Sequence, residues 1–156
     1  PPRPPGRNAW MRRLSCSFYE ACESLKKVAG RLKLDLAQYR ELAAFAQFGS
    51  ELDEASRAQL NRGEKTVEIL KQVQFEPMPL EKQVMIIYVA THGYLDDLKL
   101  ELVKPFEVEF HKFMESQYPD VGHSISQTKN LDEATENKLN EAIKKFKQEF
   151  LGKEQK

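Results

Sequence analysis

Side chains suited to catalysis or metal binding are few and widely spaced in this sequence. The histidines are His92, His111 and His123, and no two have the spacing that lets neighbouring helical turns share a metal ion. The adjacent acids Asp96–Asp97 are typical of a solvated turn rather than of a catalytic acid and base. The segment Ser15–Ser17 has no nearby base that would activate a nucleophile. The sequence therefore predicts no catalytic residue and no metal site.

Glycine-rich patterns that bind phosphate do not occur. Neither G-x-x-x-x-G-K-[ST] nor G-x-G-x-x-G is present. The two cysteines, Cys16 and Cys22, have no histidines at zinc-ligand spacing, and two cysteines do not make a disulfide scaffold. We interpret both as free thiols of a reducing compartment.

Length and composition indicate one domain with a modest core. The protein has 156 residues, of which 40% are hydrophobic, and its 24 basic side chains balance 24 acidic ones. Neutrality argues against a nucleic-acid binder, which usually carries a basic excess. The longest apolar run, Val84–Ala90, is far shorter than the ~18–20 residues that span a bilayer. We therefore expect no nucleic-acid partner and no direct membrane insertion.

The charges are unevenly distributed along the sequence. Residues 1–34 carry eight basic and two acidic side chains, whereas residues 35–156 carry 16 basic and 22 acidic ones. Four of the first five residues are prolines, which deny a regular helix because they lack the N–H. The sequence predicts a disordered or non-native basic tail over residues 1–25 and one domain over residues 26–156.

Helical periodicity in the apolar residues begins at Asp35. The first predicted helix ends at Gly49, where a helix stop is expected. Ser50 followed by Asp53 is the expected cap of a second helix, which fades before Pro77.

The apolar run Val84–Ala90 is interpreted as a central helix buried on all sides. Pro79 stands where helices begin and Gly93 where they end. Two amphipathic helices follow, one carrying Leu102 to Met114 and one carrying Leu139 to Phe150.

The stretch between these two helices, Pro119–Thr128, is polar and compatible with a short helical turn. Asn130 is the expected cap of the last helix. We interpret the phenylalanines from 106 to 150 as core. Together these patterns predict an all-α fold, a bundle of about five to six helices.

Several ordered segments resemble the C-terminal domain of the F-type ATP synthase alpha subunit. They are residues 27–42, 44–53, 60–63, 68–72, 81–84 and 93–97. Residues 44–53, AFAQFGSELD, match that family's A-F-A-Q-F-G-S-D-L-D almost letter for letter. The resemblance extends from about Lys26 to Phe150 and implies a helical bundle.

For the intact enzyme, the resemblance implies a regulatory, non-catalytic subunit of a proton-transporting ATP synthase. Alpha subunits alternate with beta subunits in a hexamer around the gamma rotor, so beta and gamma are the implied partners. The implied cofactor of the intact subunit is ATP or ADP with magnesium. The implied location is peripheral, on the cytoplasmic face of the bacterial membrane or its organelle equivalent.

The resemblance also assigns two sets of site residues. The rotor-facing loop comprises Phe45, Gln47, Phe48, Gly49, Ser50, Glu51 and Asp53. An adenine contact in the non-catalytic nucleotide site falls on Gln72, Val73 and Gln74. An amide side chain suits an adenine edge because it offers a donor and an acceptor side by side.

The sequence departs from the family at its start. The family's phosphate-binding loop, magnesium ligands and catalytic arginine lie upstream of the matching region and have no counterpart here, and residues 1–24 do not align with it. We therefore expect a fragment that by itself is inactive and binds no cofactor. The alternative is a free-standing helical adaptor whose basic tail binds an acidic partner.

Overall fold

The computed structural model describes residues 23–47, 52–71 and 78–154. Most of the predicted tail lies outside these residues. Of the predicted site residues, Phe48, Gly49, Ser50 and Glu51 and the adenine-contact residues Gln72, Val73 and Gln74 also lie outside them.

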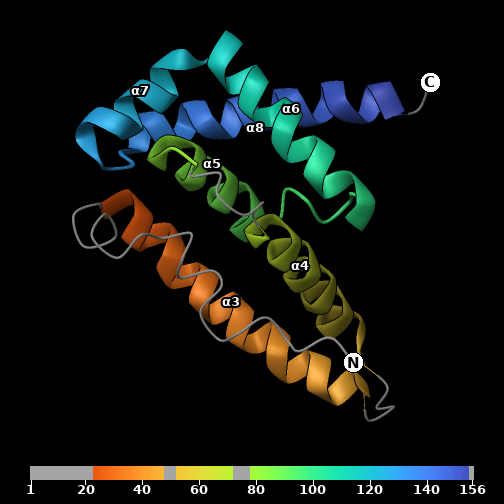
Figure 1. The fold of residues 1–156 in the computed structure, drawn as a ribbon. Helices are drawn as coiled ribbons and strands as arrows, with labels where there is room; N and C mark the ends of the chain where they lie inside the picture. Colours follow the sequence, from red (N-terminus) through yellow and green to blue (C-terminus); the bar gives the residue numbers. More distant parts are fainter. Residues whose placement is uncertain (1–22, 48–51, 72–77, 155–156) are drawn as a thin grey trace.

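The described residues form six α-helices and one short 3-10 helix, which confirms the all-α prediction. The helices are α3 (Glu23–Gln47), α4 (Glu54–Leu70), α5 (Leu80–Thr91), η1 (Leu100–Leu102), α6 (Val103–Gln117), α7 (Pro119–Thr128) and α8 (Glu133–Glu154). In Figure 1, α3 and α4 form one side of the bundle, α6, α7 and α8 form the other, and α5 runs between them.

Helix α5 is the buried centre of the bundle, as the sequence predicted. Every residue of Val84–Ala90 is buried, and α5 contacts α3, α4 and α7. Its N-cap is Pro79 and its C-cap is His92. Gly93 follows with φ of +76°, a left-handed conformation that favours glycine and ends the helix. A helix surrounded in this way has no polar face, which explains the uninterrupted apolar run.

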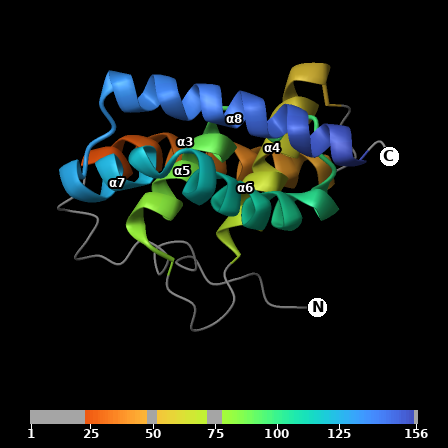
Figure 2. The same ribbon diagram turned by 90° about the horizontal axis from the view of Figure 1, so that it is seen from above.

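A cluster of aromatic rings joins α6 to α8. The Phe106 ring lies 5.0 Å from that of Phe146 and 5.2 Å from that of Phe150, both edge-on. Phe113 lies 5.2 Å from Phe146. Figure 2 shows α8 lying along the side of the bundle above α6 and α7. Edge-to-face rings stabilise such a contact beyond their buried area, and the core interpretation of these phenylalanines is confirmed.

Helix α3 begins earlier than the apolar periodicity indicated. It starts at Glu23 rather than near Asp35. Its buried residues in this first half are Val28, Ala29, Leu32 and Leu36. These positions follow the 3.6-residue period and face the core, although charged residues surround them in the sequence.

Two predicted helix caps were wrong by two or three residues. The N-cap of α4 is Asp53 and not Ser50. At the start of α8, the Asp132 carbonyl accepts a hydrogen bond from the Glu136 N–H at 2.9 Å. The Asp132 side chain accepts another from the Thr135 N–H at 3.3 Å. Asp132 therefore caps this helix in place of Asn130. Several residues able to cap stand close together at both helix starts, and the backbone decides which one is used.

A polar network fastens the central helix to α8. The Tyr88 hydroxyl donates to Glu136 Oε1 at 2.8 Å and lies 3.1 Å from Asn140 Oδ1. The Tyr94 hydroxyl donates to the same Asn140 oxygen at 2.8 Å. Burial, followed by the hydrogen bond to Glu136, raises the pKa of Tyr88 to about 12.

This network predicts a loss of stability in alkali. An unfolded tyrosine loses its proton near pH ~10, whereas folded Tyr88 keeps it up to about pH 12. The stability that this tyrosine contributes is therefore fully present below about pH 10 and is lost between about pH 10 and pH 12. We expect Tyr88→Phe to flatten this decline in urea unfolding, although losing the hydroxyl costs about 1 kcal/mol at neutral pH. An equally steep decline in both proteins would contradict the assignment.

Candidate functional site

Helices α3 and α4 form a hairpin whose closed end carries the loop assigned above. They pack along much of their length. The closest approach is at Gly63 of α4, where an added Cβ would lie 2.5 Å from the Tyr39 Cβ. Gln59 also donates a side-chain hydrogen bond to Gln38. Only a residue without a side chain lets the two backbones approach this closely, so Gly63 sets the spacing of the hairpin.

The described loop residues lie at the tip of this hairpin. Phe45 and Gln47 belong to the last turn of α3 and are exposed, Phe45 with 60% of its surface accessible. Asp53 is exposed at the start of α4, where a hydrogen bond from the Ser56 side chain lowers the pKa of its carboxyl. The structure therefore brings these three residues to one end of the hairpin, with an aromatic ring and an anion available to another surface.

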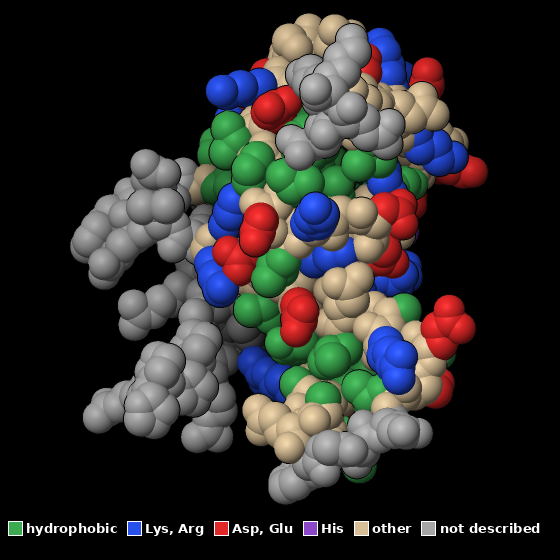
Figure 3. Space-filling view, turned by 90° about the vertical axis from the view of Figure 1, so that its right-hand side faces the viewer, with side chains coloured by type: hydrophobic (Ala, Val, Ile, Leu, Met, Phe, Trp, Pro, Cys, Tyr) green, Lys and Arg blue, Asp and Glu red, His purple; other side chains and the backbone are tan. Residues whose placement is uncertain are grey.

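Figure 3 shows the side of the molecule on which the hairpin ends. Hydrophobic side chains are exposed in its lower part and again in a band near the top, and basic and acidic side chains are interspersed among them. An exposed phenylalanine at a helix end is the kind of feature that marks an interaction surface when other apolar groups surround it.

The segment assigned to the adenine contact leaves α4 at a fixed point. Lys71 is the C-cap of α4, and its carbonyl accepts a hydrogen bond at 2.6 Å from Lys104 Nζ of α6. Lys104 also pairs with Glu107 at 3.0 Å. The end of α4, from which Gln72 continues, is thus fastened to α6.

The turn after α5 is tied to α4 and to α8 by charged side chains. Arg62 of α4 forms an ion pair with Asp96, and its Nε lies 3.1 Å from each carboxylate oxygen. Lys65 Nζ donates to the Asp96 carbonyl at 2.6 Å. Asp97 pairs with Lys147 of α8 at 2.7 Å. The adjacent acids are therefore partners in a structural network and not a free acid and base.

The electrostatics of this network follow from its contacts. The hydrogen bond to Asp96 raises the pKa of Arg62, whereas burial lowers the pKa of Lys65, which is only 3% exposed. Lys147 lowers the pKa of Asp97. The network holds its charges in fixed pairs, which suits a rigid support for the hairpin rather than proton transfer.

The three histidines lie apart in three different elements. His92 caps α5 and stacks on Tyr88 with ring centroids 3.8 Å apart. His111 is buried in α6, and His123 lies in α7 with its Nε2 2.8 Å from Gln127 Nε2. Within the described ranges no group of three histidine, cysteine or acidic side chains is arranged to hold a metal ion.

Sequence reasoning missed the residues that give the hairpin its shape. Neither Gly63 nor Tyr39 is among the site residues that the sequence predicted. A glycine inside an otherwise helical pattern is the one signal that indicates a close helix contact. Its partner, 24 residues earlier, becomes evident only in three dimensions.

None of the described helices combines the length and the apolarity needed to cross a lipid bilayer.

Comparison with known proteins gives a consistent result. Residues 22–146 match the family described as ATP synthase alpha/beta chain, C terminal domain. The protein is 54% identical over 128 residues to the ATP synthase subunit alpha of Desulforudis audaxviator, an alignment that covers 82% of this sequence and 25% of that protein. The corresponding protein of Syntrophomonas wolfei is 56% identical over 128 residues, with coverages of 82% and 25%.

The ATP synthase subunit alpha of Aquifex aeolicus is 50% identical over 129 residues, covering 83% of this sequence and 26% of that protein. The sequence thus spans about a quarter of the length of the curated relatives that it matches.

Proposed function

Since the protein belongs to the family of C-terminal domains of ATP synthase alpha and beta subunits and corresponds to that domain of an alpha subunit, we propose that it forms part of the stator of a proton-transporting F-type ATP synthase. In that role it stands with beta subunits in an alternating hexamer around the gamma subunit. The hexamer is peripheral, on the cytoplasmic face of the bacterial membrane or the organelle equivalent. The observation that carries this proposal is the alignment with three alpha subunits at 50% identity or more.

The tip of the α3–α4 hairpin is the part that we propose to face the rotor. Phe45, Gln47 and Asp53 of the described structure lie there, and Phe48, Gly49, Ser50 and Glu51 connect them in the sequence. The exposure of Phe45 and the close helix contact at Gly63 support this role. A tightly packed hairpin fixes its tip relative to the bundle, so a turning partner meets resistance there.

Nucleotide binding is proposed for the intact subunit only. Gln72, Val73 and Gln74 follow the anchored end of α4, and the two glutamine amides suit an adenine edge. The phosphates and magnesium of ATP or ADP would be held by residues outside this sequence. Adenine contacts of this kind supply about 1 kcal/mol per hydrogen bond, too little for tight binding without phosphate contacts.

The proposal is tested by two substitutions in a full-length alpha subunit that carries this domain. Gly49 follows the last helical residue of α3 by two positions, where the sequence predicts a positive φ. We expect Gly49→Val to strain the loop and to reduce ATP synthesis severalfold. Glu51→Gln should leave synthesis nearly unchanged, because exposed charge contacts contribute about 0–1 kcal/mol and are screened by salt.

The rate of coupled ATP synthesis is measured for both variants in membrane vesicles. Wild-type rates for Gly49→Val in an assembled complex would contradict the rotor-facing assignment of the loop. Detection in cells of a stable protein of about 156 residues, without a full-length alpha subunit that contains it, would instead favour the alternative of a free-standing helical adaptor.

A further inference from the structure

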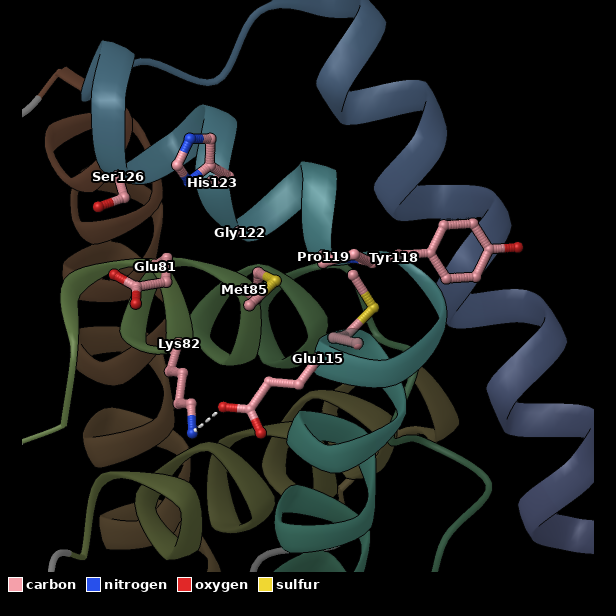
Figure 4. Close-up of a pocket in the computed structure, with 10 residues that line it drawn as sticks. Glu81, Lys82, Met85, Glu115, Tyr118, Pro119, Gly122, His123 and Ser126 are labelled. Atoms are coloured by element: carbon pink, nitrogen blue, oxygen red, sulfur yellow. Dashed lines mark ion pairs between the residues drawn. The ribbon is translucent and has the colours of Figure 1, made fainter.

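A cleft of about 230 Å³ lies where α5, α6 and α7 meet (Figure 4). Helix α7 and the tip of the α3–α4 hairpin lie at opposite ends of the bundle (Figure 1). The residues of the cleft come from the first turns of α5, the end of α6 and the body of α7. Typical ligand sites measure ~300–1,000 Å³. The cleft lies below that range, so it has room only for a very small molecule or for one side chain of a protein.

The floor of the cleft is apolar and polarizable. Met85 of α5 and Met114 of α6 line it, both nearly buried, and Pro119 closes one side. Methionine side chains adapt their shape and make favourable contacts between sulfur and aromatic rings. This floor suits an aromatic ring or a short aliphatic segment.

One carboxylate on the rim of the cleft has no ion-pair partner among the described residues. Lys82 and Glu115 neutralise each other in an ion pair of 2.6 Å that bridges α5 and α6. Across the described ranges, the Glu81 side chain forms neither an ion pair nor a hydrogen bond, although it lines the same cleft and is half-buried. In Figure 4 its carboxylate and the Ser126 hydroxyl lie at the same side of the cleft. Both oxygens can accept hydrogen bonds from a ligand.

The remaining polar side chains around the cleft supply no positive charge to pair with Glu81. His123 on the rim pairs with Gln127 of its own helix. Asp120 in the first turn of α7 offsets the partial positive charge of that helix end. Glu81 likewise stands in the first turn of α5, at the positive end of that helix. The lining thus combines an apolar floor with one carboxylate that has no ion-pair partner among the described residues.

We propose that this cleft binds a small organic monocation, with an ammonium or guanidinium group at Glu81 and Ser126 and an apolar body over Met85 and Met114. The cation is either a free amine or the side chain of an arginine or lysine in another protein. The chemistry is the same in both cases. None of the residues that line it belongs to the proposed rotor-facing loop or to the proposed adenine contact.

Benzylamine and benzyl alcohol form a matched pair of probes, since they share the ring and differ in charge. The protein has four methionines, so labelling with [methyl-¹³C]methionine gives four NMR signals. We expect benzylamine to shift the Met85 and Met114 methyl signals saturably, with a dissociation constant of about 1 mM or lower. Met78, which does not line the cleft, is the internal control. Benzyl alcohol should bind at least about fivefold more weakly.

Two variants locate the binding. Glu81→Gln removes the charge and should weaken benzylamine binding about fivefold to tenfold without changing that of benzyl alcohol. Glu101→Gln is the control and should leave both affinities unchanged, because Glu101 is an exposed acid of η1 that does not line the cleft. Ser126→Trp should fill the cleft and abolish the shifts, while the melting temperature shows that the fold is retained.

N-acetylarginine N-methylamide distinguishes the two sources of the cation. Binding at least as tight as that of benzylamine favours a protein side chain, and weaker binding favours a free amine. Shifts that do not saturate, or equal affinity for the charged and neutral probes in the parent protein and in Glu81→Gln, would overturn the proposal.

Discussion

Replacing Ile87 by aspartate should unfold the domain. Ile87 lies in α5 with none of its surface exposed, and every residue of that helix from Val84 to Thr91 is buried. A charge without a partner at such a place costs about 4–5 kcal/mol or more. That penalty is comparable with the ~5–15 kcal/mol by which a domain is stable. Circular dichroism should show the loss of helix and of a cooperative melting transition.

The matched control for Ile87→Asp is Val108→Asp. Val108 is in α6, but 53% of its surface is exposed. The charge stays in water there, so the melting curve should move by only a few degrees. If Ile87→Asp melted like the parent protein, α5 would not be the centre of the bundle.

The second large effect is expected at the contact between α3 and α4. An alanine Cβ at position 63 would lie 2.5 Å from the Tyr39 Cβ, which cannot move without its backbone. Gly63→Ala should therefore lower the free energy of unfolding by about 1–3 kcal/mol in urea titrations, in spite of the higher helix propensity of alanine.

Gly30→Ala is the control for this contact. Gly30 also lies within a helix, α3, but nothing stands within 4 Å of the Cβ that alanine would add. Alanine should raise the free energy of unfolding there by up to about 1 kcal/mol. We therefore predict that Gly63→Ala lowers the free energy of unfolding and that Gly30→Ala raises it. If both substitutions raised it, the α3–α4 contact at Gly63 would not be as close as the structure shows.

The apolar pattern of the sequence was sufficient to predict the central helix and the aromatic core. An uninterrupted apolar run such as Val84–Ala90 indicates a buried helix when Pro79 precedes it and Gly93 follows it. The early start of α3 was missed because the buried positions before Asp35, which are Val28, Ala29 and Leu32, stand among basic residues in the sequence. Burial there depends on α5, which comes much later in the sequence.

The two candidate sites differ in how far the sequence alone could predict them. The rotor-facing assignment of residues 45–53 comes from continuous segments that resemble a family, and it stays a prediction. The cleft could not be found in that way, because Glu81, Glu115 and Ser126 stand on three helices that only the fold brings together. The ion pair of Lys82 with Glu115, 33 residues away, likewise follows from the packing of α5 on α6.

Photo-crosslinking from Phe45 tests the central claim most directly. A photoreactive phenylalanine analogue is placed at position 45 in a full-length alpha subunit carrying this domain, within the assembled synthase. A second complex carries the analogue at Val108, which has a similar exposed fraction on another helix. We predict that irradiation joins position 45, and not position 108, to the gamma subunit. Failure of position 45 to crosslink to gamma in an active complex would contradict the account.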